Sequence, residues 1–380
     1  MTTDALREAI TRNRAWYCLE CGKCSAVCPI TLWERRAYTG PRLLVEKAVQ
    51  GRTAEVLDDP LFWSCLTCKR CSALCPSDVH FSEFLRDARA LARDQGRSGE
   101  CTHADVVQTW GKVMSQPKKQ QNRLGWLDGS LTVSAASDTL YFVGCLPYYD
   151  PMFRRIGAEG VEIARAAVRI LNHLGIEPQI LADERCCGHD QLWQGDLETF
   201  QALARLNVER LTATGARRIV TTCPECARTL KLDYPQWAAT HGMEVVHLSE
   251  LVARSSPIMH AAVPALRITY QDPCRLGRHL GVYDAPRRVL AGLGLEIAEM
   301  ERSGKTALCC GTSNWTACGQ VSKNIQVERL REARATGAEM IVTACVKCQI
   351  HFRCAQDDPL VREQIGIPVR DWATVVAERL

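Results

Sequence analysis

Two pairs of adjacent cysteines, each followed by a glycine, are the residues of this chain that point most clearly to chemistry. They are Cys186-Cys187-Gly188 and Cys309-Cys310-Gly311. Neighbouring side chains in an extended backbone point to opposite faces, so a disulfide between them would be strained. A single zinc ion usually takes its ligands from two separated pairs. A cluster of several iron atoms can accept both thiolates, and the glycine lets the backbone pass close to it.

Each pair belongs to a longer pattern, Cys…CysCysGly…CysxxCys, which occurs twice. The first copy contains Cys145, Cys186, Cys187, Cys223 and Cys226, and the second contains Cys274, Cys309, Cys310, Cys345 and Cys348. Five cysteines per copy is one more than a cubane iron–sulfur cluster needs. Two zinc sites or a buried group of thiols are the alternatives, but the doubled spacing favours iron–sulfur chemistry.

The beginning of the chain contains the spacing of bacterial two-cluster ferredoxins, also twice. The two runs are Cys18, Cys21, Cys24 and Cys28-Pro29, and Cys65, Cys68, Cys71 and Cys75-Pro76. In this pattern three close cysteines hold one cubane and the fourth ligates the other. The predicted ligand sets are therefore crossed: Cys18, Cys21, Cys24 and Cys75 for one cluster, and Cys65, Cys68, Cys71 and Cys28 for the other. Two zinc ribbons would have no use for this crossing.

Composition excludes several other classes of function. The chain has 380 residues and 21 cysteines, and 46% of its residues are hydrophobic, so it can build large cores. We expect no signal peptide and no membrane span. Thiols that serve metals suggest the cytoplasm, or a place on the inner face of the membrane held through a partner. The net charge of +4 gives no reason to expect nucleic-acid binding.

We predict an α+β multidomain fold, with a mainly helical two-cluster ferredoxin-like domain followed by a duplicated α/β cysteine-rich body. The ferredoxin-like domain is expected at 1–97, a connecting segment at 98–138, and the two cysteine-rich domains at 139–258 and 259–380. Apolar periodicity predicts helices at 42–50, 81–97, 161–174, 197–214, 285–293 and 321–336. Strands are predicted at 140–143, 176–181, 218–222, 267–270, 295–299 and 340–343, and residues 245–251 run from a strand into a helix. Alternation of strands and helices indicates parallel sheets, whose strand ends would carry the cysteines.

These motifs resemble those of heterodisulfide reductase. The later region resembles its cysteine-rich subunit and the first region its small ferredoxin subunit, fused here as in the catalytic subunit of the membrane-linked enzymes. Residues 270–279 and 281–287 also match the family. The resemblance implies two noncubane [4Fe–4S] clusters, one on each five-cysteine motif, with the substrate disulfide reacting between them. The stretch Gly311–Trp315 is less glycine-rich than the family pattern, which bears on the identity of the substrate.

The leading hypothesis is an oxidoreductase subunit that takes electrons from a partner through the two cubanes and reduces a disulfide at the noncubane clusters. No Gly-x-Gly-x-x-Gly loop or haem motif is present, so we expect no flavin or NAD site in this chain. The partner would be a flavoprotein or a haem-b membrane subunit. The alternative is an electron relay in a flavin-dependent dehydrogenase of the glycolate, lactate or glycerol-3-phosphate type that passes electrons toward quinone.

The residues expected to carry the reaction are Cys187, Cys310 and His189. His189 could bond a cluster sulfur or protonate a leaving thiolate, or could simply be bonded to backbone. A second group, Arg275, Arg278 and His279, either offsets cluster charge, binds an anionic substrate or is solvated. Three cysteines outside the motifs are interpreted as buried small apolar residues: Cys101, Cys318 and Cys354.

Overall fold

The computed structural model describes residues 3–34, 39–237, 242–255 and 266–380, and it divides into two compact units. The first unit contains Met1–Lys112, Gly188–Phe200 and Leu308–Gln326; the second contains Val113–Cys187, Gln201–Ala307 and Val327–Leu380. About 53% of the chain is helical and the sheets are small and parallel, so the predicted α+β class is confirmed. The chain passes between the units directly after Cys187.

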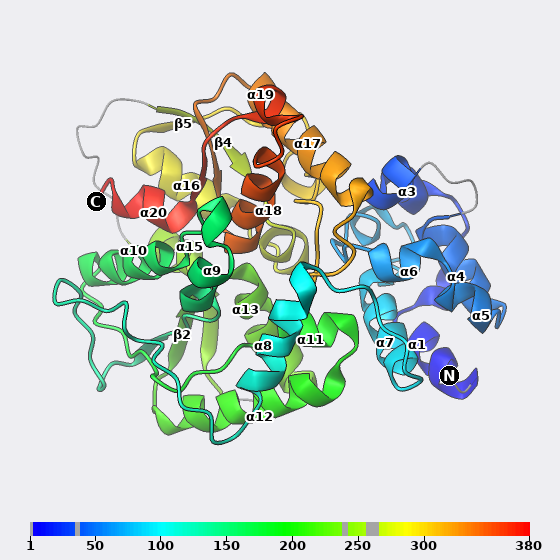
Figure 1. Ribbon diagram of the computed structural model, residues 1–380, viewed down its shortest axis with the longest axis horizontal. Coiled ribbons are helices and arrows are strands. Elements are labelled where there is room, and N and C mark those ends of the chain that lie inside the picture. Colours follow the sequence, from blue (N-terminus) through cyan, green and yellow to red (C-terminus); the bar gives the residue numbers. More distant parts are fainter. Residues whose placement is uncertain (1–2, 35–38, 238–241, 256–265) are drawn as a thin grey trace. The chain divides into compact units, whose positions relative to one another are not determined.

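The first unit is built from short helices around the ferredoxin-type cysteine loops (Figure 1). They are α1 (Thr3–Arg12), η1 (Ala15–Tyr17), α2 (Lys23–Val27), α3 (Pro29–Glu34), α4 (Pro41–Val49), α5 (Thr53–Leu57), α6 (Pro60–Ser64), η2 (Ser72–Leu74), α7 (Phe81–Arg93), η3 (His103–Asp105) and α11 (His189–Gln194). The predicted helices at 42–50 and 81–97 are α4 and α7. Helix α6 begins with Pro60 after Asp59, whose carboxylate accepts a hydrogen bond from the amide of Leu61, a favourable start for a helix.

The second unit contains two parallel sheets, and this confirms the predicted alternation of strands and helices. The first sheet has the order β1 (Thr139–Tyr141), β2 (Arg218–Thr221), β3 (Glu244–His247). The second has the order β5 (Leu295–Ile297), β4 (Leu266–Gln271), β6 (Met340–Thr343), β7 (Val369–Asp371). Register pairs Leu140 with Ile219 in the first sheet and Thr269 with Ile341 in the second.

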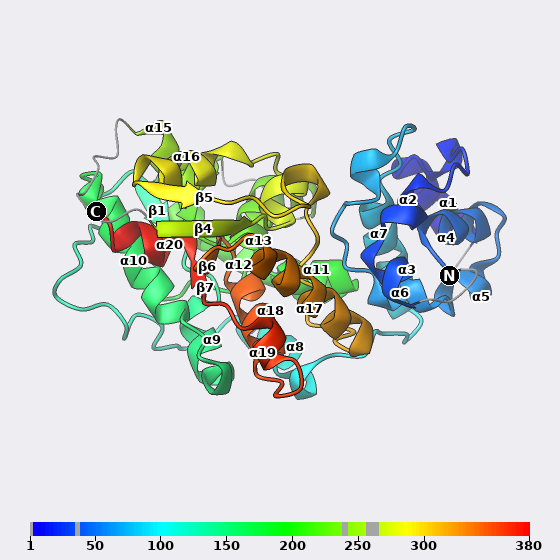
Figure 2. The same ribbon diagram turned by 90° about the horizontal axis from the view of Figure 1, so that it is seen from above.

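Helices of the second unit surround these sheets, and α10 packs against α20 (Figures 1 and 2). They are α9 (Leu146–Met152), η4 (Arg154–Ile156), α10 (Gly160–His173), α13 (Pro224–Arg228), η5 (Thr229–Asp233), α14 (Tyr234–Trp237), α15 (Leu248–Arg254), η6 (Arg275–His279), α16 (Asp284–Gly292), η7 (Gly304–Thr306), α18 (Val346–Gln356), α19 (Arg362–Ile365) and α20 (Trp372–Ala377). Three helices begin in the first unit and end in the second: α8 (Val106–Met114), α12 (Leu197–Ala213) and α17 (Gln320–Ala335).

The predicted strand at 176–181 is wrong. The segment makes only an isolated parallel bridge, in which Gln179 pairs with Leu140 of β1 at the edge of the first sheet. Pro178 lies in the middle of the segment and has no N–H to donate, which limits the ladder there. Strand β7 was not predicted, because Val369–Asp371 is too short to show alternation.

The predicted connecting segment contains a helix of its own, α8, and it supplies buried residues to the second unit. Trp126 is buried, and so is Arg123, whose side chain pairs with Glu184 at 2.7 Å. The carboxylate of Glu184 in turn accepts the amides of Val143 and Gly144, at the end of the backbone segment that leads to Cys145.

Candidate metal centres

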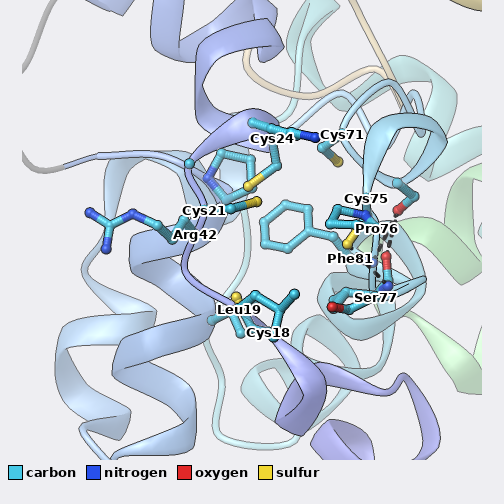
Figure 3. A pocket seen from close by; sticks show the side chains of 16 residues that line it. Cys18, Leu19, Cys21, Cys24, Arg42, Cys71, Cys75, Pro76, Ser77 and Phe81 are labelled. Atoms are coloured by element: carbon cyan, nitrogen blue, oxygen red, sulfur yellow. Dashed lines mark hydrogen bonds between the residues drawn. The ribbon is translucent and has the colours of Figure 1, made fainter.

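The first four-cysteine set predicted from the sequence lines one cavity of the first unit. Cys18, Cys21, Cys24 and Cys75 all face it, together with Leu19, Arg42 and Phe81. Figure 3 shows the cysteine sulfurs arranged around the ring of Phe81. We name this the outer cavity, because Cys21 is exposed and Cys18, Cys24 and Cys75 are half-buried.

The second predicted set lines a neighbouring cavity. It contains Cys28, Cys65, Cys68 and Cys71, all of which are buried, and we name it the inner cavity. Cys71 lines both cavities. Each cavity therefore contains one of the two crossed groups that the spacing predicts, with Cys71 as a fifth thiol at the outer cavity. Four thiols are the donor set of a cubane cluster, and the division of the ligands between two clusters stays a prediction.

Both cysteine loops use left-handed backbone at matching positions. In the first loop Glu20 and Gly22 have φ of 52° and 74°, and in the second Thr67 and Lys69 have φ of 46° and 61°. Such turns direct backbone N–H groups toward one centre and favour negative charge there. Accordingly the amides of Thr67 and Val79 lie 3.4 Å from the sulfurs of Cys65 and Cys75.

Burial makes the inner thiols hard to ionise without a metal. Desolvation raises the pKa of Cys28 to about 11 and that of Cys65 to about 12, and the Arg89 guanidinium opposes the shift at Cys65. Iron ligation requires thiolates, so cluster binding at this cavity would release protons.

Arg89 ties the inner-cavity loop to the segment that follows the first Cys-Cys-Gly. It is 1% exposed, and its guanidinium donates to the carbonyls of Phe62, Trp63 and Cys65 and, at 3.0 Å, to that of Trp193. Gly195 has φ of +84°, and an added Cβ would lie 2.4–2.5 Å from the backbone of Arg89 and Ala90. The close approach of this segment to α7 therefore requires glycine.

The segment after the second Cys-Cys-Gly contacts the same loop. The hydroxyl of Thr67, between Cys65 and Cys68, lies 3.1 Å from that of Ser313. The two segments also bond to each other, because Gln194 donates to the carbonyl of Asn314 at 2.7 Å. In the first unit, therefore, the residues following both Cys-Cys-Gly sequences converge on the inner-cavity loop.

All five cysteines of the first five-cysteine motif lie in the second unit. The sulfur of Cys145 is 3.5 Å from that of Cys186, and the sulfur of Cys187 is 3.5 Å from that of Cys226. Interaction with Cys186 raises the pKa of the Cys187 thiol. Interaction with Cys187 and, second, with Cys223 raises the pKa of the Cys226 thiol, so Cys223 belongs to the same group.

Polar side chains fix the backbone of this first group. Asn207 donates to the carbonyl of Cys186 at 3.0 Å, and the hydroxyl of Tyr234 donates to that of Cys187 at 3.1 Å. Sequence reasoning missed these two residues, because neither belongs to a recognisable motif. A Cβ at Gly144 would lie 3.0 Å from the Cys226 sulfur, so the backbone next to Cys145 approaches the thiols closely.

The second five-cysteine motif is divided between the units. Cys309 and Cys310 belong to the first unit and are buried; Cys274, Cys345 and Cys348 belong to the second. Gly311 has φ of +87°, and a Cβ there would lie 2.7 Å from the carbonyl of Ser322, so glycine is required at this position. The assembly of these five thiols into one site stays a prediction.

Elements of the two cysteine-rich halves meet within the second unit. Glu225, between Cys223 and Cys226, forms a short ion pair with Lys347, which lies between Cys345 and Cys348. The side chains are 11% and 7% exposed. The inner residues of the two CysxxCys turns therefore bind each other.

A buried cationic group lies where α13 packs against η6. Arg228 Nε is 3.1 Å from His279 Nδ1, and an Arg275 amino nitrogen is 2.6 Å from His279 Nε2. Arg228 also pairs with Asp233. Arg275 and His279 are buried, so the solvated alternative is wrong for them, whereas Arg278 is half-buried and donates to the carbonyl of Ala307.

The remaining predicted residues have mixed outcomes. His189 is buried at the start of α11 with its ring 5.8 Å from that of Trp193, and its chemical role stays a prediction. The expectation that the three cysteines outside the motifs are buried is wrong, because Cys101, Cys318 and Cys354 are each half-buried. They lie beside polar groups, such as Thr312 for Cys318, which a small apolar residue would not need.

All 21 cysteines lie in the described part of the chain and are thiols rather than disulfides. In that part no three His, Cys, Asp or Glu side chains are arranged to hold a single metal ion, so the case for a metal group rests on the thiol-lined cavities and the spacing. Within the same ranges, none of the helices has the length and apolar character needed to cross a bilayer.

Comparison with known domain families agrees with these groups of cysteines. Residues 8–79 match a 4Fe-4S dicluster domain, and residues 139–231 and 268–353 each match the cysteine-rich domain called CCG. This chain is an iron–sulfur protein with a dicluster domain and two CCG domains. The first CCG match includes all five cysteines of the first motif, and the second includes all five of the second.

Several curated relatives with similar sequences are named as oxidoreductases or their subunits. A chain of the dihydromethanophenazine:CoB–CoM heterodisulfide reductase from Methanosarcina mazei is 31% identical over 69% of this chain and 64% of its own length. A chain of the CoM/CoB fumarate reductase from Methanothermobacter marburgensis is 27% identical over 92% of this chain and 69% of its own. EtfAB:quinone oxidoreductase from Syntrophomonas wolfei is 31% identical over 60% and 34%. The protein thus spans less than two thirds of its heterodisulfide reductase relative.

Proposed function

We propose that this chain is an oxidoreductase subunit that takes electrons from a partner through two cubane [4Fe–4S] clusters and reduces a disulfide at two noncubane clusters. The outer cubane would be held by Cys18, Cys21, Cys24 and Cys75, and the inner one by Cys28, Cys65, Cys68 and Cys71. The noncubane clusters would be held by the two five-cysteine motifs. The similarity to a heterodisulfide reductase chain supports the reaction.

One observation carries the proposal. The loop of the inner cavity is hydrogen-bonded to the segments that follow both Cys-Cys-Gly sequences, through Arg89 to Trp193 and through Thr67 to Ser313. A relay of electrons needs a fixed, short connection between its centres. These contacts supply such a connection between the loop of the inner cavity and the residues that follow each Cys-Cys-Gly sequence.

The chain's own residues would prepare the reaction. When bound, the clusters supply one-electron storage and iron atoms that can bind sulfur. Burial of Cys186, Cys187, Cys309 and Cys310 would exclude water from the reacting sulfurs. Arg275, which follows Cys274 directly in the chain, would offset negative charge on the thiolates of the second motif. One disulfide consumes two electrons and two protons and yields two thiols; we assign one proton delivery to His189.

A second function, electron relay toward quinone, is favoured by the similarity to a protein named EtfAB:quinone oxidoreductase. In that case a flavoprotein would still donate electrons to the outer cluster, but no disulfide would be turned over.

Two serine variants separate these functions. Cys187→Ser and Cys310→Ser should each weaken one noncubane site, because serine is a poor substitute for thiolate at iron, while the cubanes still take electrons from a donor. Anaerobic metal analysis should give about sixteen irons per wild-type chain. Disulfide turnover should collapse in both variants while stopped-flow reduction of the cubanes persists. If Cys310→Ser folds, lacks its cluster and reduces the disulfide normally, the two-cluster mechanism is wrong.

A further inference from the structure

We propose that the two pairs of adjacent cysteines have different tasks in the reaction. Asn207 and Tyr234 are positioning residues that hold the first pair in one conformation, whereas residues 311–317, which follow the second pair, change conformation when a disulfide binds beside them. The inference rests on the proposed function, because it divides the work of the same reaction between its two sites.

Asn207 holds the backbone of the first pair at two points. Its Oδ1 accepts a hydrogen bond from the amide of Arg185 at 2.9 Å, and its Nδ2 donates to the carbonyl of Cys186 at 3.0 Å. The residue is 1% exposed, so water does not compete for these bonds. Both partners are backbone groups, and Asn207 therefore acts on the thiols through the conformation of the chain.

Tyr234 holds the other cysteine of the first pair. Its hydroxyl donates to the carbonyl of Cys187 at 3.1 Å and accepts a hydrogen bond from Asn207 Nδ2 at 3.0 Å. We name Asn207 and Tyr234 together the backbone lock. Because the lock holds the backbone at both cysteines, the two adjacent thiols keep their separate partners, Cys145 for one and Cys226 for the other.

The second copy of the motif has a different residue at the matching position. Asn-Val-Glu-Arg-Leu at 207–211 corresponds to Gln-Val-Glu-Arg-Leu at 326–330. Gln326 is longer by one methylene, and its amide donates to the hydroxyl of Thr312 at 3.2 Å. Gln326 is 0% exposed, and within the described ranges its Oε1 has no hydrogen-bond partner. Turning the amide over would leave its nitrogen open instead, so one polar group of Gln326 is available to a second conformation of the loop.

The loop after the second pair holds backbone strain that the segment after the first pair lacks. Asn314, Trp315 and Ala317 have φ of 56°, 56° and 53°, a left-handed conformation that is unfavourable for residues with a Cβ. The segment after the first pair is helix α11, and among residues 184–200 the backbone is left-handed only at the glycines Gly188 and Gly195. Strain of this kind collects at ligand sites and switch regions.

The strained loop is joined to a thiol of the second pair. The Cys310 sulfur lies 3.8 Å from the carbonyl of Thr312, and the hydroxyl of Thr312 lies 3.8 Å from the sulfur of Cys318. A sulfur that binds beside Cys310 must therefore displace groups of this loop. At the first pair, by contrast, the backbone lock resists such a movement.

The test measures hydrogen exchange of the full chain, purified anaerobically, with and without bis(2-hydroxyethyl) disulfide as the probe. The variants Asn207→Leu and Tyr234→Phe each remove one side of the backbone lock. The matched control is Gln179→Met, because Gln179 is also buried and donates to two backbone carbonyls. Turnover of the probe with reduced methyl viologen gives kcat and KM, and EPR spectroscopy reports the clusters.

In the wild type the probe should change exchange at residues 311–317 at least about threefold and leave residues 184–188 unchanged. Each lock variant should speed exchange at 184–188 at least about tenfold, because a buried backbone group loses its partner. Each should also alter the EPR spectrum and lower kcat with little change in KM, since the second pair still binds the probe. Gln179→Met should do none of these. If Asn207→Leu does not fold, Tyr234→Phe, which removes only a hydroxyl, decides the result.

A pair of alanine variants tests the strain. Ala317→Gly should not lower the thermal midpoint, because glycine adopts the left-handed conformation freely. Ala202→Gly is the control, since Ala202 is also half-buried but lies inside helix α12, and it should lower the midpoint by about 2–4 °C.

The proposal is overturned if the probe changes exchange at both pairs alike, at the first pair only or at neither. It is also overturned if the lock variants behave like Gln179→Met, or if Ala317→Gly lowers the midpoint as much as Ala202→Gly. If residues 311–317 respond to the probe while the wild type reduces no disulfide, the proposed function fails and the division between the two pairs stands.

Discussion

The ion pair between Glu225 and Lys347 is expected to hold the two CysxxCys turns together, and a double-mutant cycle tests this. Both side chains are largely buried. Lys347→Met leaves the Glu225 carboxylate without this cation, and Glu225→Gln does the reverse. Breaking a buried pair from one side costs about 3–5 kcal/mol. At about 2–4 °C per kcal/mol for a unit of this size, the thermal midpoint should fall by roughly 6–20 °C.

The double variant removes both charges, so it should recover most of the loss. Calorimetry on anaerobically purified protein measures the midpoint, and EPR spectroscopy shows whether the clusters of the two CCG domains survive. The exposed pair of Arg155 and Asp357, 3.2 Å apart, is the matched control, and Arg155→Met should cost less than about 1 kcal/mol. If both single variants behave like this control, or if the double variant loses the sum of the two, the pair does not join the turns.

Two further predictions concern the first unit. Cys28→Ser should damage the cluster of Cys65, Cys68 and Cys71 and leave that of Cys18, Cys21 and Cys24 largely intact, as followed by EPR and iron content. If the cluster of Cys18, Cys21 and Cys24 is lost instead, the crossed ligand sets are wrong. Arg89→Met should remove the hydrogen bonds that the guanidinium donates to four backbone carbonyls. It should therefore lower the thermal midpoint by more than Arg93→Met, because the ion pair of Arg93 with Asp196 at 3.4 Å is only partly buried. Equal shifts of the thermal midpoint in the two arginine variants would contradict a stabilising role for the hydrogen bonds of Arg89.

The crossed groups of cysteines and the alternation of strands and helices could be predicted, because both depend on spacing along the chain. Cysteine spacing is fixed by the size of the metal group, and a parallel sheet requires a crossover between strands. The prediction of a strand at 176–181 was wrong because it considered only the apolar pattern. Pro178 has no backbone N–H to donate to a neighbouring strand.

Contacts between polar side chains that are distant in the sequence could not be predicted in the same way. For two of these contacts the sequence nevertheless contains an indication. Arg89 lies four residues after Leu85 on the apolar stripe of α7, and a charged residue in such a place must find buried partners. Glu225 and Lys347 occupy the same position in two copies of one motif with opposite charges. The contact of Thr67 with Ser313 left no signal, because hydroxyl residues are common in loops.

In the proposed electron relay, the step between the two cavities and the step beyond the inner cavity would depend on different kinds of contact. Cys71 lines both cavities, and each ferredoxin-type loop supplies a cysteine to the cavity of the other. The separation of the two proposed cubanes would therefore be set by short loops within one helical unit. In the proposed relay, transfer beyond the inner cavity would depend instead on the side-chain contacts of Thr67 and Arg89. Loss of Thr67 or Arg89 should therefore slow transfer to the CCG sites more than transfer between the two cubanes.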